Sequence, residues 1–169
     1  IFNYLLSLPG IEIGLNCFKD SKKITKIEIP SSVTSIGISA FFGCTNLEQI
    51  TLPSSIQSIL KYAFFGCEKL TKIIIPPNVT KIEDHSFEGC ISLSEISIPS
   101  SITSIGISSF KLCKKLKQIS IPSSVKVIGD FAFNECNLLE ELIIPSSVKS
   151  IGDSFVSECF SLKNISLPL

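Results

Sequence analysis

Apolar and polar residues alternate in short runs that recur along the chain. In residues 47–53 (LEQITLP), Ile50 and Leu52 alternate with polar residues, and Pro53 ends the run. Alternation with a period of two is typical of a half-buried strand, and proline ends a strand because it lacks an N–H donor. Each run therefore predicts a short β-strand.

The runs repeat every 23 residues without a slip, and single residue types mark the period. The recurring residues are Pro30, Pro53, Pro76, Pro99, Pro122, Pro145 and Pro168; Cys44, Cys67, Cys90, Cys113, Cys136 and Cys159; and Phe41, Phe64, Phe87, Phe110 and Phe133. A unit of this size is too small to bury its own apolar face, so strands of successive units must stack in parallel, about 4.8 Å apart. The chain is predicted to be a solenoid with inward columns of Leu and Ile.

The rest of each repeat predicts a turn and a return to the core. Serine pairs such as Ser54-Ser55 follow the proline and are predicted to bond local backbone groups, and Ile59 re-enters the core. Glycine recurs at a position that we expect to need permissive backbone angles, in Gly37, Gly106, Gly129 and Gly152. Residues 40–44 (AFFGC) are too short for a full helix, so one or two turns of α- or 3₁₀-helix are expected there, with Phe41 filling the core.

The repeat resembles a known family. L-x-x-I-x-I-x-x-S-x-[VI] is similar to the leucine-rich repeat signature, and Asn78 restores the usual asparagine in one repeat. The pattern I-P-S-S-V-x-S-I-G-x-x-A-F-x-G-C, clearest in residues 29–44, closely resembles the BspA-like leucine-rich repeat family over residues 24–169. The resemblance implies a right-handed horseshoe with a parallel β-sheet on the concave face and short helical, 3₁₀ or irregular segments on the convex face. It also implies adhesion to host cells, matrix proteins or other microbes.

Residues 1–169 are interpreted as one solenoid of about seven repeats, the first degenerate and the last truncated. Pro9 lies two residues closer to Gly14 than later prolines lie to their glycines, and the chain stops at Leu169 within a strand pattern. Terminal repeats normally carry a polar cap, and none is visible at the C-terminus. Because the sequence also contains no methionine, we expect a piece of a longer array.

Composition excludes some partners. The 15 basic and 15 acidic residues cancel and are scattered along the chain, unlike the basic surface of a nucleic-acid-binding protein. Pro, Ser or Lys interrupts every Ile-rich stretch before it reaches the roughly 20 residues of a membrane span. We expect no nucleic-acid binding and no membrane insertion by this segment, and the sequence leaves the cellular compartment open.

The cysteines, the single histidine and the serines offer little support for catalysis. Six cysteines occur once per repeat without the close pairs of zinc sites, so buried free thiols are expected; Cys17 lies off that column and is also interpreted as a buried small side chain. His85 beside Asp84 could act as a base, but adjacent residues on a turn seldom converge on one reacting atom, and a surface substitution is favoured. No acid, base or nucleophile breaks the repeat, so we predict no enzyme activity, no cofactor and no metal.

The outward strand positions remain as a candidate protein-binding surface, because they vary while the core positions stay constant. A solvated surface explains their polar, mixed-charge character equally well, with Ile74 and Ile143 as isolated apolar points. A surface or secreted adhesion protein and an intracellular scaffold would both use this face; the resemblance favours the first, and the unpaired cysteines favour the second. The candidate residues are Lys26, Glu28, Glu48, Gln49, Thr51, Thr71, Lys72, Ile74, Glu95, Ser97, Lys117, Gln118, Ser120, Glu140, Glu141 and Ile143.

Overall fold

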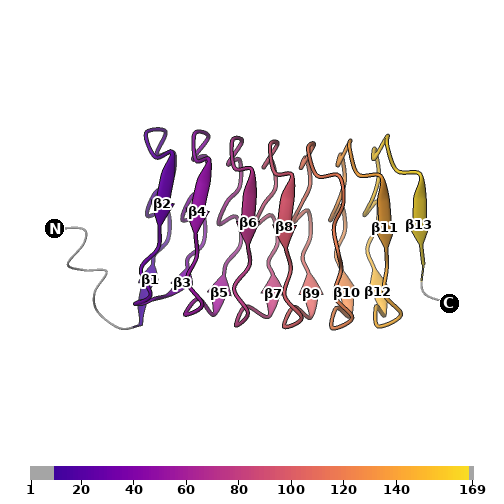
Figure 1. The fold of residues 1–169 in the computed structure, drawn as a ribbon, viewed down its shortest axis with the longest axis horizontal. Helices are drawn as coiled ribbons and strands as arrows, with labels where there is room; N and C mark the ends of the chain where they lie inside the picture. Colours follow the sequence, from indigo (N-terminus) through magenta and orange to yellow (C-terminus); the bar gives the residue numbers. More distant parts are fainter. Residues whose placement is uncertain (1–9, 168–169) are drawn as a thin grey trace.

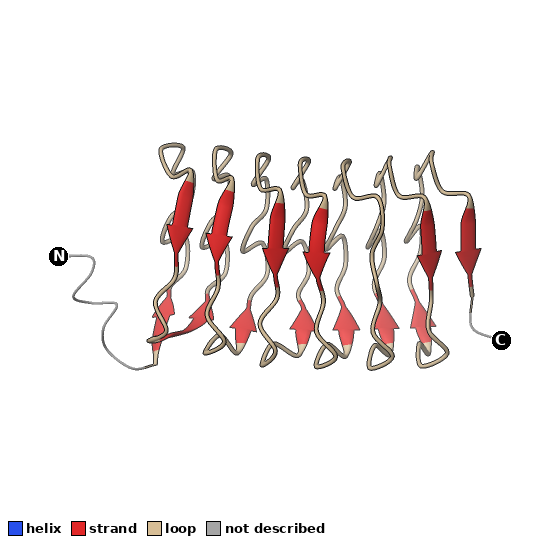
Figure 2. Ribbon diagram, in the orientation of Figure 1, coloured by secondary structure: helices blue, strands red, loops and turns tan. Residues whose placement is uncertain are grey.

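The computed structural model describes residues 10–167, which form thirteen short β-strands and no helix. One row of strands precedes the repeat prolines: β2 (Lys26–Glu28), β4 (Gln49–Thr51), β6 (Lys72–Ile74), β8 (Glu95–Ser97), β11 (Glu141–Ile143) and β13 (Asn164–Ser166). The other row consists of β1 (Ile11–Ile13), β3 (Val33–Ile36), β5 (Ser58–Ile59), β7 (Lys81–Ile82), β9 (Ser104–Ile105), β10 (Val127–Ile128) and β12 (Ser150–Ile151). The strands of the two rows point in opposite directions (Figure 2), as expected for a chain that coils around a core.

The first row forms what we call the front sheet, and it confirms the predicted parallel stack. β2 pairs with β4 through Lys26↔Gln49, Ile27↔Ile50 and Glu28↔Thr51, so partners are one 23-residue repeat apart. In β2, β4, β6, β8 and β11 the middle residue faces the interior and its two neighbours face solvent, whereas all three residues of the terminal β13 are exposed. The alternating pattern of the sequence therefore sets both the strand and its register.

The second row was not predicted, because the residues after each proline were assigned to a turn. Parallel pairs such as Ile36↔Ile59 and Ile82↔Ile105 join its strands, which form one group of three and one group of four. Six of the seven strands contribute a buried isoleucine, such as Ile59 or Ile105, and Ile151 on β12 is half-buried. The prediction that Ile59 re-enters the core is confirmed, and the strand around it is the addition.

The segment corresponding to residues 40–44 in each repeat is irregular, so the predicted helical turns are wrong. Amide donors alternate there: Phe42 N–H donates to the Ser39 carbonyl of its own turn (3.1 Å), whereas Phe41 N–H donates to the Ala63 carbonyl of the next turn (2.8 Å). Ser39 and Gly43 have φ of 54° and 66°. These left-handed residues interrupt any right-handed helix, and the amides gain bonds between turns instead.

Phenylalanine rings fill the core, as predicted, and they stack into a column that was not predicted from the sequence. The ring centroids of Phe41, Phe64, Phe87, Phe110 and Phe133 lie 5.3–5.6 Å apart in sequence order, with planes within 7° of parallel. All five rings are fully buried. Figure 1 shows the turns side by side in one row, and the horseshoe curve stays a prediction. One ring per turn at nearly constant spacing matches such a row.

The recurring glycines serve a different purpose from the predicted one. Gly106 and Gly129 do not have positive φ, but a Cβ on either residue would lie 2.7 Å from a backbone nitrogen of the preceding turn, that of Asp84 or Ile107. Close approach between stacked turns therefore favours glycine at Gly106 and Gly129, whereas Leu60 and Glu83 occupy the equivalent position in two other repeats.

The serine pairs also bond differently from the prediction. Ser55 Oγ donates to the Val33 carbonyl (2.7 Å), and Ser124 Oγ donates to the Ile102 carbonyl (2.6 Å). Both carbonyls lie 22 residues earlier, so the bonds join neighbouring turns rather than local backbone. Stacking brings the carbonyl of the preceding turn beside the hydroxyl, which no local sequence pattern indicates.

The described part of the chain contains no helix with the length and apolar character needed to span a membrane.

Candidate functional site

All sixteen predicted binding residues are exposed on one surface, which we call the front face. They lie on β2, β4, β6, β8 and β11, beside those strands, or in residues 117–120, which lie between β8 and β11. The stacked strands bring together residues that are 23 positions apart in the sequence, such as Lys72 and Glu95. The alternation places these residues outside because the intervening Ile73 is buried.

The charges of the front face are partly paired. Lys72 Nζ lies 2.7 Å from Glu95 Oε2, and Lys163 Nζ lies 3.7 Å from Glu140 Oε2. More than half of each of these four side chains is exposed, so each pair contributes about 0–1 kcal/mol to stability. Glu141 has no ion-pair partner within the described part of the chain.

A hollow of about 740 Å³ opens on the front face between β6 and β11. Ile74 and Ile143 line it and are 60% and 59% exposed, while Ser97 and Ser120 occupy the same strand position in the two intervening repeats. The small serine side chains between the two large isoleucine side chains leave the space of the hollow. The isoleucines predicted as isolated apolar points therefore line one shared hollow.

The residues at the base of the hollow were not predicted as binding residues, because they belong to the inward-facing columns of the repeat. Ile119 and Ile121 are buried and Ile96 is half-buried, yet all three line the hollow. The sequence carries a signal for this feature in the order Ile74, Ser97, Ser120, Ile143 at one repeat position.

The front sheet is interrupted at the hollow. Ile75 N–H donates to the Ser97 carbonyl and Ile144 N–H to the Ser166 carbonyl, at 3.1 and 2.9 Å. The equivalent bond from Ile98 N–H to the Ser120 carbonyl is missing among the described residues, and so are the bonds of Leu52 N–H and Ile121 N–H. At Ile98 the pairing is lost as well, because no register pair joins β8 to residues 117–121. The pairing between β4 and β6 is also reduced, to the single register pair Gln49↔Lys72.

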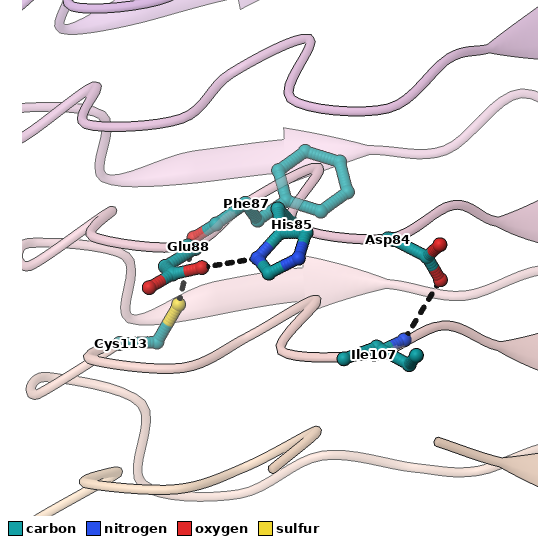
Figure 3. Close-up of polar contacts among 6 residues, drawn as sticks. All are labelled: Asp84, His85, Phe87, Glu88, Ile107 and Cys113. Carbon is teal, nitrogen blue, oxygen red and sulfur yellow. Dashed lines mark hydrogen bonds and ion pairs between the residues drawn. The ribbon is translucent and has the colours of Figure 1, made fainter. Parts of the chain in front are cut away.

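His85 is not paired with Asp84 as a catalytic base would be. Figure 3 shows the two side chains directed to different partners: His85 Nδ1 lies 2.5 Å from Glu88 Oε2, whereas Asp84 Oδ1 accepts the Ile107 N–H at 2.9 Å. The His85 ring stacks on Tyr62 with centroids 4.6 Å apart. The Asp84 carboxylate also forms an ion pair with Lys61. His85 and Asp84 therefore each contact other residues of the fold instead of each other.

Five cysteines of the repeat column are buried free thiols, as predicted, and Cys159 is half-buried. Each thiol donates to a carbonyl of the preceding turn, as in Cys113 Sγ to Phe87 O (3.4 Å; Figure 3). Burial raises the pKa of Cys90 to about 12. Cys17 is exposed, so its predicted burial is wrong. The equivalent Ala40 and Ala63 are buried within stacked turns, whereas Cys17 belongs to the first turn that the structure describes.

The chain matches the family described as "BspA type Leucine rich repeat region" in six copies, over residues 11–114 and 80–169. No curated protein matches the sequence of this chain. A leucine-rich repeat protein of T. pallidum has a similar structure, with a TM-score of 0.85 and 31% identity over 93% of this chain and 73% of the other.

Two other similar structures share the repeat architecture. A leucine-rich repeat protein of Bacteroides ovatus gives a TM-score of 0.64 at 29% identity, covering 92% of this chain and 58% of the other. A leucine rich cell surface protein of Faecalibacterium prausnitzii gives 0.50 at 25% identity, covering 90% and 62%. The chain thus spans about three fifths of the length of these two proteins.

Proposed function

The chain belongs to the BspA-type leucine-rich repeat family, and on this premise we propose that it is a non-catalytic module that binds a protein through its front face. The observation that supports this proposal most strongly is the contrast between constant core columns and varied, exposed front positions. Residues 1–169 act together in this proposal as one binding domain.

We propose a surface or secreted adhesion role, with a host cell-surface or matrix protein as the partner. The similar F. prausnitzii protein is described as a cell surface protein, which supports this compartment. An intracellular scaffold is the alternative, and the free cysteines favour it because disulfides are common in secreted repeat proteins. Fractionation of the full-length protein distinguishes the two: recovery in the cytosol of a chain without an export signal contradicts the adhesion role.

Affinity capture with surface variants tests the use of the front face. The combined variant Lys72→Ala, Ile74→Ala, Glu141→Ala, Ile143→Ala removes exposed side chains, so we expect partner binding to fall about tenfold or more while the thermal unfolding midpoint changes little. Lys61→Ala lies outside the front face and is the control, with unchanged binding expected. Binding that responds to Lys61→Ala but not to the combined variant would contradict the proposal.

A further inference from the structure

The hollow between Ile74 and Ile143 has the dimensions of a slot for an extended chain. The two isoleucines are three repeats apart, which is roughly 14 Å at the usual strand spacing. The inward residues Ile96, Ile119 and Ile121 form an apolar base between them. An aliphatic side chain placed there would remove apolar surface from water on several sides.

Backbone groups at the interruption favour an extended partner. The Ile98 N–H and the Ser120 carbonyl do not bond to each other within the described residues, unlike the equivalent groups of Ile75 and Ser97. Free groups at a strand edge bind an extended peptide by main-chain hydrogen bonds. A helix has no free main-chain groups along its length to offer them.

The charge at the hollow favours a cationic partner group. Three charged residues line it: Lys72 and Glu95 neutralise each other, and Glu141 carries an unpaired carboxylate. Glu141 lies on the same strand as Ile143, two residues away, so both side chains face outward. A segment bound against Ile143 therefore brings its neighbouring side chain near this carboxylate.

We propose that the hollow binds an extended segment of a partner polypeptide, with a branched aliphatic side chain against the isoleucines and a lysine or arginine beside Glu141. This inference rests on the proposed function, since it specifies what the front face recognises. Strand alternation in the segment directs every second side chain into the hollow, so the cation next to Glu141 lies at the rim.

A random twelve-residue peptide library displayed on phage, selected on the immobilised 169-residue chain, is the probe. We expect the enriched peptides to carry Val, Ile or Leu next to Lys or Arg. Ser120→Phe fills the hollow and should lower their affinity about tenfold or more. Thr51→Phe, at the equivalent exposed position of β4 outside the hollow, is the matched control and should leave affinity unchanged.

Two further measurements examine the charge and the backbone. Glu141→Gln should lower affinity several-fold, about three- to tenfold, whereas Glu28→Gln on β2 should not. N-methylation of a selected peptide at alternate amides should abolish binding, and methylation at the intervening amides should be tolerated, because an extended segment pairs through every second residue.

Several results would overturn the inference: no enriched peptide, equal effects of Ser120→Phe and Thr51→Phe, or N-methyl effects without a period of two. Loss of binding in both phenylalanine variants would leave the front face as the binding surface and reject the hollow alone. Peptides that bind both variants normally but lose affinity with Lys61→Ala would reject the hollow and the proposed function together.

Discussion

The phenylalanine column and the front sheet are built from the same repeats, yet they differ in continuity. Five rings stack at 5.3–5.6 Å without a break, and the cysteine thiols beside them donate from turn to turn. The front sheet loses its pairing between β8 and residues 117–121 within the same stretch of chain. Core packing, the paired strands of the second row and the backbone bonds between turns thus hold adjacent turns in register here, and the front face is left free to vary.

The largest expected effect comes from opening the column in its middle. Phe87→Ala removes a fully buried ring that stacks on Phe64 and Phe110, and it should cost about 3–5 kcal/mol of unfolding free energy. Phe160→Ala is the matched control, because that ring is largely exposed and its loss should change stability by about 0.5 kcal/mol or less. Urea denaturation measures both variants, and equal costs would show that the column does not dominate stability.

A smaller effect is expected where turns approach most closely. Gly129→Ala places a methyl group 2.7 Å from the Ile107 nitrogen and 2.8 Å from the Gly106 carbonyl carbon, so we expect a loss of about 1–3 kcal/mol. Gly14→Ala has open space around its Cβ and should be close to neutral. The same denaturation experiment compares them. If Gly129→Ala were as mild as Gly14→Ala, the turns would be able to move apart without cost.

The third effect concerns the buried thiols and depends on pH. Unfolded cysteines ionise from about pH 8.5, whereas Cys90 in the folded state stays protonated until about pH 12. Its contribution to stability is therefore fully present below the unfolded pKa and is lost as the pH rises towards the folded pKa.

Thiol labelling and alkaline unfolding measure this effect. In the native protein we expect exposed Cys17 to react first, and Cys17→Ser to remove that fast phase while Cys90 reacts only after unfolding. Wild type should lose more stability between pH 8 and 10 than Cys90→Ala does. Fast reaction of Cys90 at neutral pH would contradict its burial.

The sequence predicted those features of the fold that are set within a single repeat. The alternation around Ile50 indicated the strand, its register and its exposed neighbours, because all depend on a period of two. The left-handed conformation at Ser39, the Ser55 bond to the preceding turn and the close contact at Gly129 arise only when turns stack, so no single repeat could reveal them.

The same distinction applies to the candidate site. Exposure of Ile74 and Ile143 could be predicted from one strand at a time. Their shared hollow depends on the small serines between them and on the missing pairing at Ile98, which are relations among four repeats.

Amide hydrogen exchange at Ile98 tests most directly the claim that the front sheet is interrupted while the core continues. Ile75 and Ile144 occupy equivalent positions with hydrogen bonds of 3.1 and 2.9 Å to the next turn. In NMR-detected exchange we expect the Ile98 amide to exchange at least about tenfold faster than both, and Phe87 and Phe110 amides to be strongly protected. Equal protection of Ile75, Ile98 and Ile144 would contradict the interruption and the hollow that depends on it.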